Sequence, residues 1–371
     1  MHSSSTSGSR LCLNSKKLSL TLKALALTSL IFPFHAINAS KATYQFNDVV
    51  NQNKLTVVSV ANPTAVFKDG DYYHGFGYDL VRNYADNLNV QLEFKTVDDN
   101  ATALKMVASG KANFAMTTAN IEAVETKKLT SLPATCGDFN SLNKNGLNSE
   151  INWVFKHADD PLTQTASGFI CKSKDNGSIQ QLASFYNRNV VNEDAWDTIQ
   201  RDLSKRMPIY KASFQKTAAE YDLDWQLLAA IGYQESYLKP TSISPTGVRG
   251  LMMLTDSTAR AMGVTNRDDA AQSIHGGAKY FDQMLSRYED IPFPDRNWYA
   301  LVAYNMGPGA VSQVQKRVKA QGKDPDNWVN LYAYLDRNKA SNGQYRQAVQ
   351  YVTRIRSYLE RIKTTPQLVN I

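Results

Sequence analysis

A single carboxylate interrupts an apolar stripe in the second half of this 371-residue chain. Leu228, Ile231, Glu235 and Leu238 are spaced by three, four and three residues, so they share one face of a predicted helix. Apolar surroundings disfavour the charged form of a carboxyl and raise its pKa, and a carboxyl that stays protonated near neutral pH can act as a general acid. If the helix instead ends here and the side chain escapes to solvent, Glu235 has no such role.

Two groups of residues downstream favour the chemical interpretation. The stretch "SPTGVRGLMML" places Gly247 and Gly250 in a short loop, and such glycines let a backbone approach a ligand or a helix closely. The stretch "ALVAYNMGPGAV" ends a hydrophobic helix with Tyr304 and Asn305 just before a Gly-Pro-Gly turn. An aromatic ring and an amide at a helix end suit the lining of a sugar site.

Most glycosidases use a second carboxylate as nucleophile or base. The nearest candidate here is Asp256, in "MLTDST". Its favoured interpretation is structural, because a position in the first turn of a helix, beside Thr255, is one where the helix dipole favours an acid.

The elements that must position these residues are of two kinds. Residues 40–190 alternate between β-branched strand candidates, such as "LTVVSV" and "VQLEF", and amphipathic helices, which predicts a partly parallel sheet covered by helices. From about residue 195 the pattern indicates six or seven helices with short loops, a compact all-α domain. We therefore predict an α+β chain of two domains. The expected segments are a signal peptide over 1–39, an α/β domain over 40–190, a linker over 191–208, an all-α domain over 209–363 and a tail over 364–371.

The first segment has the pattern of an export signal. Lys16 and Lys17 precede an apolar run, and the small residues of "HAINAS" favour cleavage after Ala39. Lys23 and Pro33 interrupt the run, which argues against a membrane-spanning anchor. We expect an exported protein.

Charge and cysteine content narrow the function classes. The formal net charge is +7, but the acid-free first 39 residues carry four of the basic side chains, so the remainder is near neutrality and has no basic stripe for nucleic acid. Cys136 and Cys171 are an even pair in an exported chain, which favours a disulfide. Since no metal-ligand spacing is present, we expect neither a metal nor a cofactor.

The first domain resembles one lobe of the periplasmic solute-binding proteins. The resemblance lies in "GFGYDL" and in the helix-to-strand turn "ASGKANFAM". Residues 128–150 are too few to build the second lobe, and Ala123 occupies the position of the arginine that usually binds a ligand carboxylate. The resemblance therefore implies an incomplete lobe that serves as a docking or regulatory scaffold for cell-wall or envelope partners.

The second domain resembles the catalytic domain of lytic murein transglycosylases of the soluble type, which have a lysozyme-like fold. The motifs that match, in chain order, are Glu235 with Ser236, the run Gly250 to Met253, Ala303 to Asn305, and Tyr351 in "QYVTRI". A truncated solute-binding lobe followed by this domain is the order of the membrane-bound lytic transglycosylase F family. That family has the "GLMMLT" form of the third motif, so Met253 replaces the usual glutamine.

This resemblance implies a lyase that cleaves the MurNAc-β-1,4-GlcNAc bond of peptidoglycan without water. Glu235 would act first as acid and then as base, giving 1,6-anhydro-MurNAc ends, as in the exotransglycosylases. The residues expected at the substrate are Ser236, Met253, Tyr304, Asn305 and Tyr351. Tyr351 is expected to hydrogen-bond to Glu235, and simple packing is the alternative. The implied location is the periplasm of a Gram-negative-type envelope, peripheral to the outer membrane.

Two other functions stay open at this point. The first is a hydrolase of goose-lysozyme type, in which Asp256 positions a water. The second is a non-catalytic protein that binds the cell wall or a small ligand.

Overall fold

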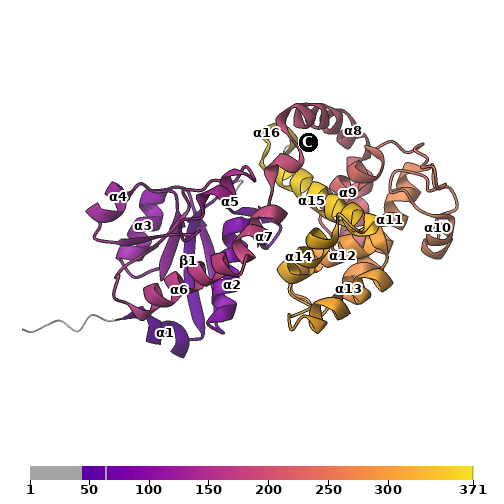
Figure 1. The fold of residues 1–371 in the computed structure, drawn as a ribbon. Helices are drawn as coiled ribbons and strands as arrows, with labels where there is room; N and C mark the ends of the chain where they lie inside the picture. Colours follow the sequence, from indigo (N-terminus) through magenta and orange to yellow (C-terminus); the bar gives the residue numbers. More distant parts are fainter. Residues whose placement is uncertain (1–43, 63–64, 370) are drawn as a thin grey trace, which may run out of the picture. The chain divides into compact units, whose positions relative to one another are not determined.

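The computed structural model describes residues 44–62, 65–369 and 371 (Figure 1). The predicted signal peptide and its cleavage after Ala39 lie outside the described residues. Two kinds of architecture follow one another along the described chain, first a sheet with covering helices and then helices alone. The predicted α+β organisation is confirmed.

A five-stranded mixed sheet organises the first domain, with strand order β4-β1-β5-β7-β6. β1 (Lys54–Val60) pairs in parallel with β4 (Gln91–Val97) and with β5 (Phe114–Thr117). β7 (Asn152–Phe155) runs antiparallel to β5 and to β6 (Thr130–Pro133). A separate hairpin is made by β2 (Phe67–Asp69) and β3 (Tyr72–His74).

Side chains alternate across this sheet, as the two-residue period of a strand requires. Val58, Ala115 and Val154 belong to a small buried cluster with α3 and α4, whereas the adjacent Phe114 and Trp153 belong to the main core, with α2 and α6. Helices therefore cover both faces, which explains why the strands are apolar on both sides. The helices of this domain are α1 (Gln45–Asn51), α2 (Phe76–Asn87), α3 (Asn100–Ala108), α4 (Ile121–Thr126), α5 (Phe139–Asn143), α6 (Pro161–Asp175) and α7 (Ser178–Phe185).

The remainder of the described chain is helical. After the short 3-10 turn η1 (Arg188–Val190), the helices are α8 (Glu193–Glu220), α9 (Trp225–Ser236), α10 (Asp256–Met262), α11 (Ala270–Arg287), α12 (Asp295–Met306), α13 (Pro308–Ala320), α14 (Trp328–Asn338), α15 (Gly343–Thr364) and α16 (Pro366–Val369). No helix in the described ranges is long and apolar enough to cross a membrane.

The segment 191–208, which the sequence predicts as a linker, lies mostly in the first half of α8. The helix continues through Pro208 and buries Trp196, Leu203 and Met207 against the core. A proline usually begins or breaks a helix, but α8 passes through Pro208. The domain limits at 190 and 209 stay predictions.

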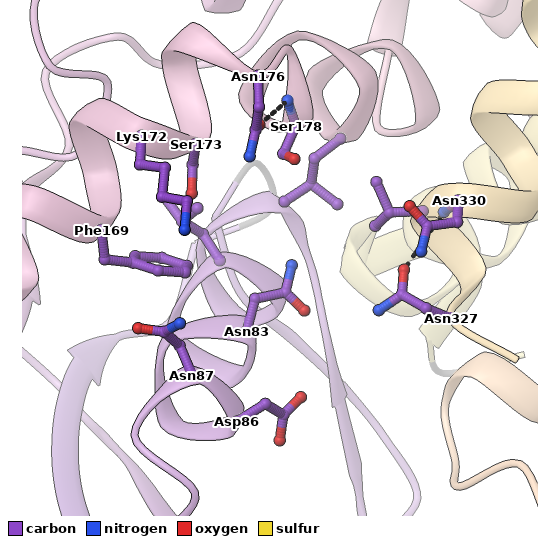
Figure 2. Close-up of a pocket in the computed structure, with 13 residues that line it drawn as sticks. Asn83, Asp86, Asn87, Phe169, Lys172, Ser173, Asn176, Ser178, Asn327 and Asn330 are labelled. Carbon is purple, nitrogen blue, oxygen red and sulfur yellow. Dashed lines mark hydrogen bonds between the residues drawn. The ribbon is translucent and has the colours of Figure 1, made fainter. Parts of the chain in front are cut away.

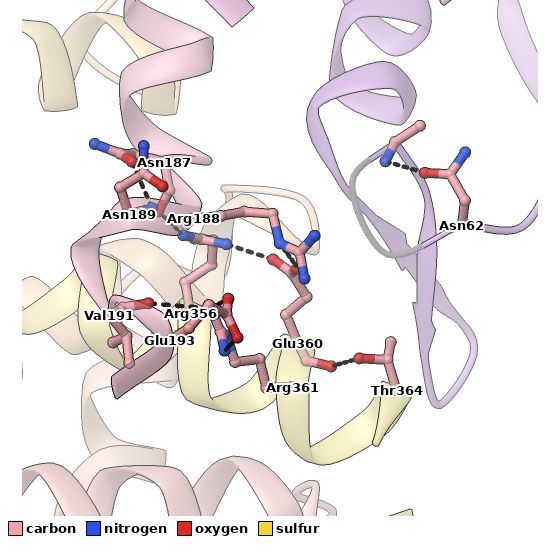
Figure 3. A network of polar contacts seen from close by, with 11 residues as sticks. Asn62, Asn187, Arg188, Asn189, Val191, Glu193, Arg356, Glu360, Arg361 and Thr364 are labelled. Carbon is pink, nitrogen blue, oxygen red and sulfur yellow. Dashed lines mark hydrogen bonds and ion pairs between the residues drawn. The ribbon is translucent and has the colours of Figure 1, made fainter. Parts of the chain in front are cut away.

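A buried ionic network fastens the chain around η1 to the last long helix, α15 (Figure 3). Arg356 is fully buried, with Nη1 2.6 Å from Glu360 Oε2 and Nη2 donating to the Asn187 carbonyl at 2.8 Å. Arg188 approaches the other Glu360 oxygen at 3.2 Å, and Arg361 donates to the Val191 carbonyl at 3.0 Å. Residues 187–191 and α15 therefore hold each other in place.

The substitution Glu360→Gln tests how much this network contributes to the free energy of unfolding. The amide keeps the shape of the side chain but leaves the buried Arg356 without its anionic partner, so the free energy of unfolding should fall by roughly 3–5 kcal/mol. Urea unfolding near pH 7 measures the change, and Glu125→Gln on exposed α4 surface is the matched control. Equal losses in the two variants would contradict the prediction.

Candidate active site

Glu235 is the penultimate residue of α9. Asp224 begins the helix, since its side chain accepts a hydrogen bond from the Gln226 N–H, and the helix ends because Tyr237 and Leu238 both adopt left-handed φ angles of 56°. Leu238 therefore lies beyond the helix, although it is buried as the apolar stripe predicts. Two consecutive left-handed residues without glycine are costly, and such strain concentrates at functional sites.

The Glu235 carboxyl lies in a desolvated position and accepts one strong hydrogen bond. Burial raises its pKa from 4.5 to about 7, while a hydrogen bond from the Tyr351 hydroxyl acts in the opposite direction. The Tyr351 oxygen is 2.6 Å from Glu235 Oε1. The residue keeps part of its surface exposed, so a substrate can reach it. The group is thus divided between acid and carboxylate near neutral pH, as a catalyst that both gives and takes a proton requires.

Tyr304, from α12, is the third member of a cluster with Glu235 and Tyr351. Its hydroxyl donates to the Met252 carbonyl at 3.1 Å, and its ring lies 5.1 Å from that of Tyr280. Burial and the neighbouring Glu235 raise the pKa of Tyr304, so the hydroxyl stays protonated. The structure therefore brings Glu235, Tyr304 and Tyr351 together from α9, α12 and α15.

Two glycines allow close packing around the loop that contains Met252. Gly250 has φ of +91°, and a Cβ there would lie 2.1 Å from the Arg267 carbonyl oxygen, so only glycine fits. Gly277 in α11 lets the Met252 side chain approach, because a Cβ would lie 2.6 Å from that of Met252. The Met252 N–H donates to Ser273 Oγ at 3.0 Å. The sequence analysis singled out neither Ser273 nor Gly277.

Ser236 supports the same loop from the α9 side. Its buried hydroxyl lies 2.8 Å from the Leu251 carbonyl and 3.1 Å from that of Gly232, within donating distance of both. The hydroxyl also accepts from the Lys239 N–H. The Ser236 hydroxyl is thus directed at the backbone of the loop.

The other predicted residues fall in three places. Met253 has a φ of 48° and directly follows Met252 in the chain. Asn305 is in the last turn of α12 and directly follows Tyr304. Both side chains are partly exposed. Asp256 is in the first turn of α10, with a side chain 69% exposed and Oδ1 2.6 Å from the Arg267 guanidinium. Its carboxylate is thus engaged in a surface ion pair.

Cys136 and Cys171 are joined by a disulfide, which ties the loop after β6 to α6 in the first domain. Across the described part of the chain, no group of three or more His, Cys, Asp or Glu residues could hold a metal ion.

Two segments of the chain match known protein families. Residues 212–327 match the Transglycosylase SLT domain, and residues 55–189 match the bacterial extracellular solute-binding proteins of family 3. The chain is thus similar to a solute-binding domain in its first part and to an SLT domain in its second. The candidate site lies in the segment that matches the SLT domain and in the helix α15 that follows it.

Several curated relatives match more than half of the chain. The chain is 40% identical over 225 residues to the membrane-bound lytic murein transglycosylase F of Marinobacter nauticus, covering 57% of this chain and 45% of the relative. For the protein of that name from Stutzerimonas stutzeri, the identity is 41% over 238 residues, 60% of this chain and 49% of the relative. For the protein of that name from Alcanivorax borkumensis, the identity is 35% over 286 residues, which cover 73% of this chain and 60% of the relative. The chain thus spans about half the length of these relatives.

The raised pKa of Glu235 predicts a pH-dependent effect of Glu235→Gln on stability. Since the folded-state pKa of about 7 lies above the ordinary value of 4.5, the folded state binds the proton more tightly, and stability from this group is lost as pH rises between those values. Glutamine cannot ionise, so the variant should exceed the native protein in stability at pH 8 by up to about 3 kcal/mol, and by much less at pH 4.5. Chemical unfolding at both pH values measures this. A stability difference independent of pH would contradict it.

Proposed function

We propose that the chain is a peptidoglycan lyase that cleaves the MurNAc-β-1,4-GlcNAc bond without water and leaves 1,6-anhydro-MurNAc ends. The observation that carries the proposal is the desolvated Glu235 carboxyl, with a pKa near 7 and a 2.6 Å hydrogen bond from Tyr351. The names of the relatives and the SLT match support the reaction class.

The reaction follows from the two protonation states of one carboxyl. Protonated Glu235 donates its proton to the glycosidic oxygen, and the bond from that oxygen to C1 of MurNAc breaks while the 2-acetamido oxygen bonds to C1. Glu235, now a carboxylate, takes the proton of the C6 hydroxyl as O6 displaces the acetamido oxygen from C1 and closes the anhydro ring. Tyr351 stabilises the carboxylate between the two steps, since its hydrogen bond favours the charged form.

Other side chains bind and position. We infer that Tyr304 and Asn305 contact the muramoyl sugar from the end of α12 and that Met253 lines the site where a glutamine is usual. Ser236 acts as a positioning residue, because its hydroxyl holds the Leu251 carbonyl and with it the loop that Tyr304 contacts.

The hydrolytic alternative needs a second carboxylate at the site. Asp256 is the candidate, but its exposed side chain is paired with Arg267, and the pKa of Glu235 is set by burial and Tyr351 alone. These observations favour the anhydro route. We further propose a periplasmic location, peripheral to the outer membrane, with the solute-binding domain as a scaffold for envelope partners.

Mass spectrometry of sacculi digested by the mature chain tests the reaction. Each released muropeptide should be lighter by one water than its hydrolysed counterpart, and Glu235→Gln should lower release by about 100-fold or more. Asp256→Asn is the matched control and should keep both rate and product mass. Reducing ends, or loss of activity in Asp256→Asn, would favour the hydrolase; unchanged release by Glu235→Gln would refute catalysis by Glu235.

The pH profile tests the role of Tyr351. Because the Tyr351 hydrogen bond lowers the pKa of Glu235, Tyr351→Phe should raise that pKa and move the alkaline limb of activity upward by about one pH unit, with a slower maximal rate. Tyr358→Phe, a buried tyrosine on the same helix, serves as control. An alkaline limb that stays in place or moves to lower pH would show that Tyr351 only packs.

A further inference from the structure

A polar groove of about 290 Å³ lies apart from the candidate active site (Figure 2). Its walls come from α2, from the end of α6 with the turn at 176–178, and from the start of α14. Figure 2 shows the side chains of α2 and α6 facing Asn327 and Asn330 across the open space. None of the residues that line it belongs to the site around Glu235.

The groove is unusually rich in carboxamides. Five asparagines line it, Asn83, Asn87, Asn176, Asn327 and Asn330. Asn176 and the α14 pair are partly used, because Asn176 accepts from the Ser178 N–H and Asn330 donates to the Asp324 carbonyl. A carboxamide offers both donors and an acceptor, so together these groups can match a ligand with many neutral polar groups.

Asn83 and Asn87 are the most informative of the five. They are four residues apart in α2, so they lie on one face of the helix. Their amides make no hydrogen bond within the described residues. Asparagine also disfavours helix interiors relative to alanine, so the pair does not serve α2 itself. Asn83 is partly buried and Asn87 is exposed, so both amides are available to hydrogen-bond a ligand in the groove.

The rest of the lining selects the kind of ligand. Phe169 offers a partly buried ring beside the amides, whereas Leu80 and Leu182 are 2% and 1% exposed and add almost no apolar surface. A pyranose ring has the same two properties, an apolar face of C–H groups and a rim of hydroxyls. Lys172 and Asp86, of opposite charge, leave the groove without a strong net field for an anion or a cation.

We propose that this groove binds an N-acetylated sugar segment of a glycan strand, as a second binding site apart from Glu235. This inference rests on the proposed function for its glycan source. The volume is just below the roughly 300–1,000 Å³ typical of small-ligand pockets, which suits one or two sugar rings. Such a site keeps the enzyme on a strand after a product leaves the active site.

Nuclear magnetic resonance can separate the two sites. In ¹⁵N-labelled Glu235→Gln protein, titration with chitotriose, a trimer of N-acetylglucosamine, should shift backbone signals of residues 83–87, 169–178 and 327–330. Adding Asn83→Ala and Asn87→Ala should weaken this response about tenfold, the scale of one or two lost hydrogen bonds, while the signals of Tyr304 and Asn305 still respond. Asn140→Ala with Gln164→Ala, on exposed surface elsewhere in the domain, is the matched control and should respond at both sites.

The outcomes distinguish this inference from the proposed function. A groove response without one at Tyr304 would count against the proposed function and leave the groove assignment standing. No groove response, or one that survives the double substitution, would overturn the glycan assignment. A groove response to an Ala-Glu dipeptide in place of chitotriose would show that the ligand is the stem peptide, which also overturns it.

Discussion

Burial of the Glu235 carboxyl is opposed by a single short hydrogen bond, and the balance of the two sets the chemistry of the site. Desolvation disfavours the carboxylate, and the Tyr351 hydroxyl at 2.6 Å favours it. With burial alone the carboxyl would give up its proton too reluctantly, and with full solvation it would hold none at neutral pH. The resulting pKa of about 7 suits a group that is first acid and then base.

The rest of the helical domain positions Glu235, Tyr304 and Tyr351 relative to one another. Gly250 and Gly277 allow the loop that contains Met252 to pack closely against its neighbours. Ser236 and Ser273 hydrogen-bond to the backbone of this loop, which also accepts the hydrogen bond of Tyr304. α15 carries Tyr351 and, further along, the buried Arg356–Glu360 pair that fastens it to residues 187–191 (Figure 3). Tyr351, the hydrogen-bond partner of Glu235, is therefore on the helix to which residues 187–191 are tied.

The sequence predicted those features that depend on local pattern or on a shared motif. The β-branched runs predict the parallel strands β1 and β4, and the apolar stripe predicts the surroundings of Glu235. Contacts that depend on tertiary packing were not readable: the Ser236 hydroxyl faces the Leu251 carbonyl, and Ser273 supports the loop from a helix far along the chain. The α8 helix extends over most of the predicted linker because Trp196 and Leu203 are buried, a contact that the local sequence does not reveal.

Glu235 is half protonated near neutral pH because the surrounding protein desolvates its carboxyl. Carbon-13 NMR of protein labelled at the glutamate carboxyls, with Glu235→Gln to assign the signal, measures that pKa directly. A midpoint near 7 is the expected result. A midpoint near the ordinary value of 4.5 would contradict it, because Glu235 would then be ionised at neutral pH and could not protonate the leaving oxygen.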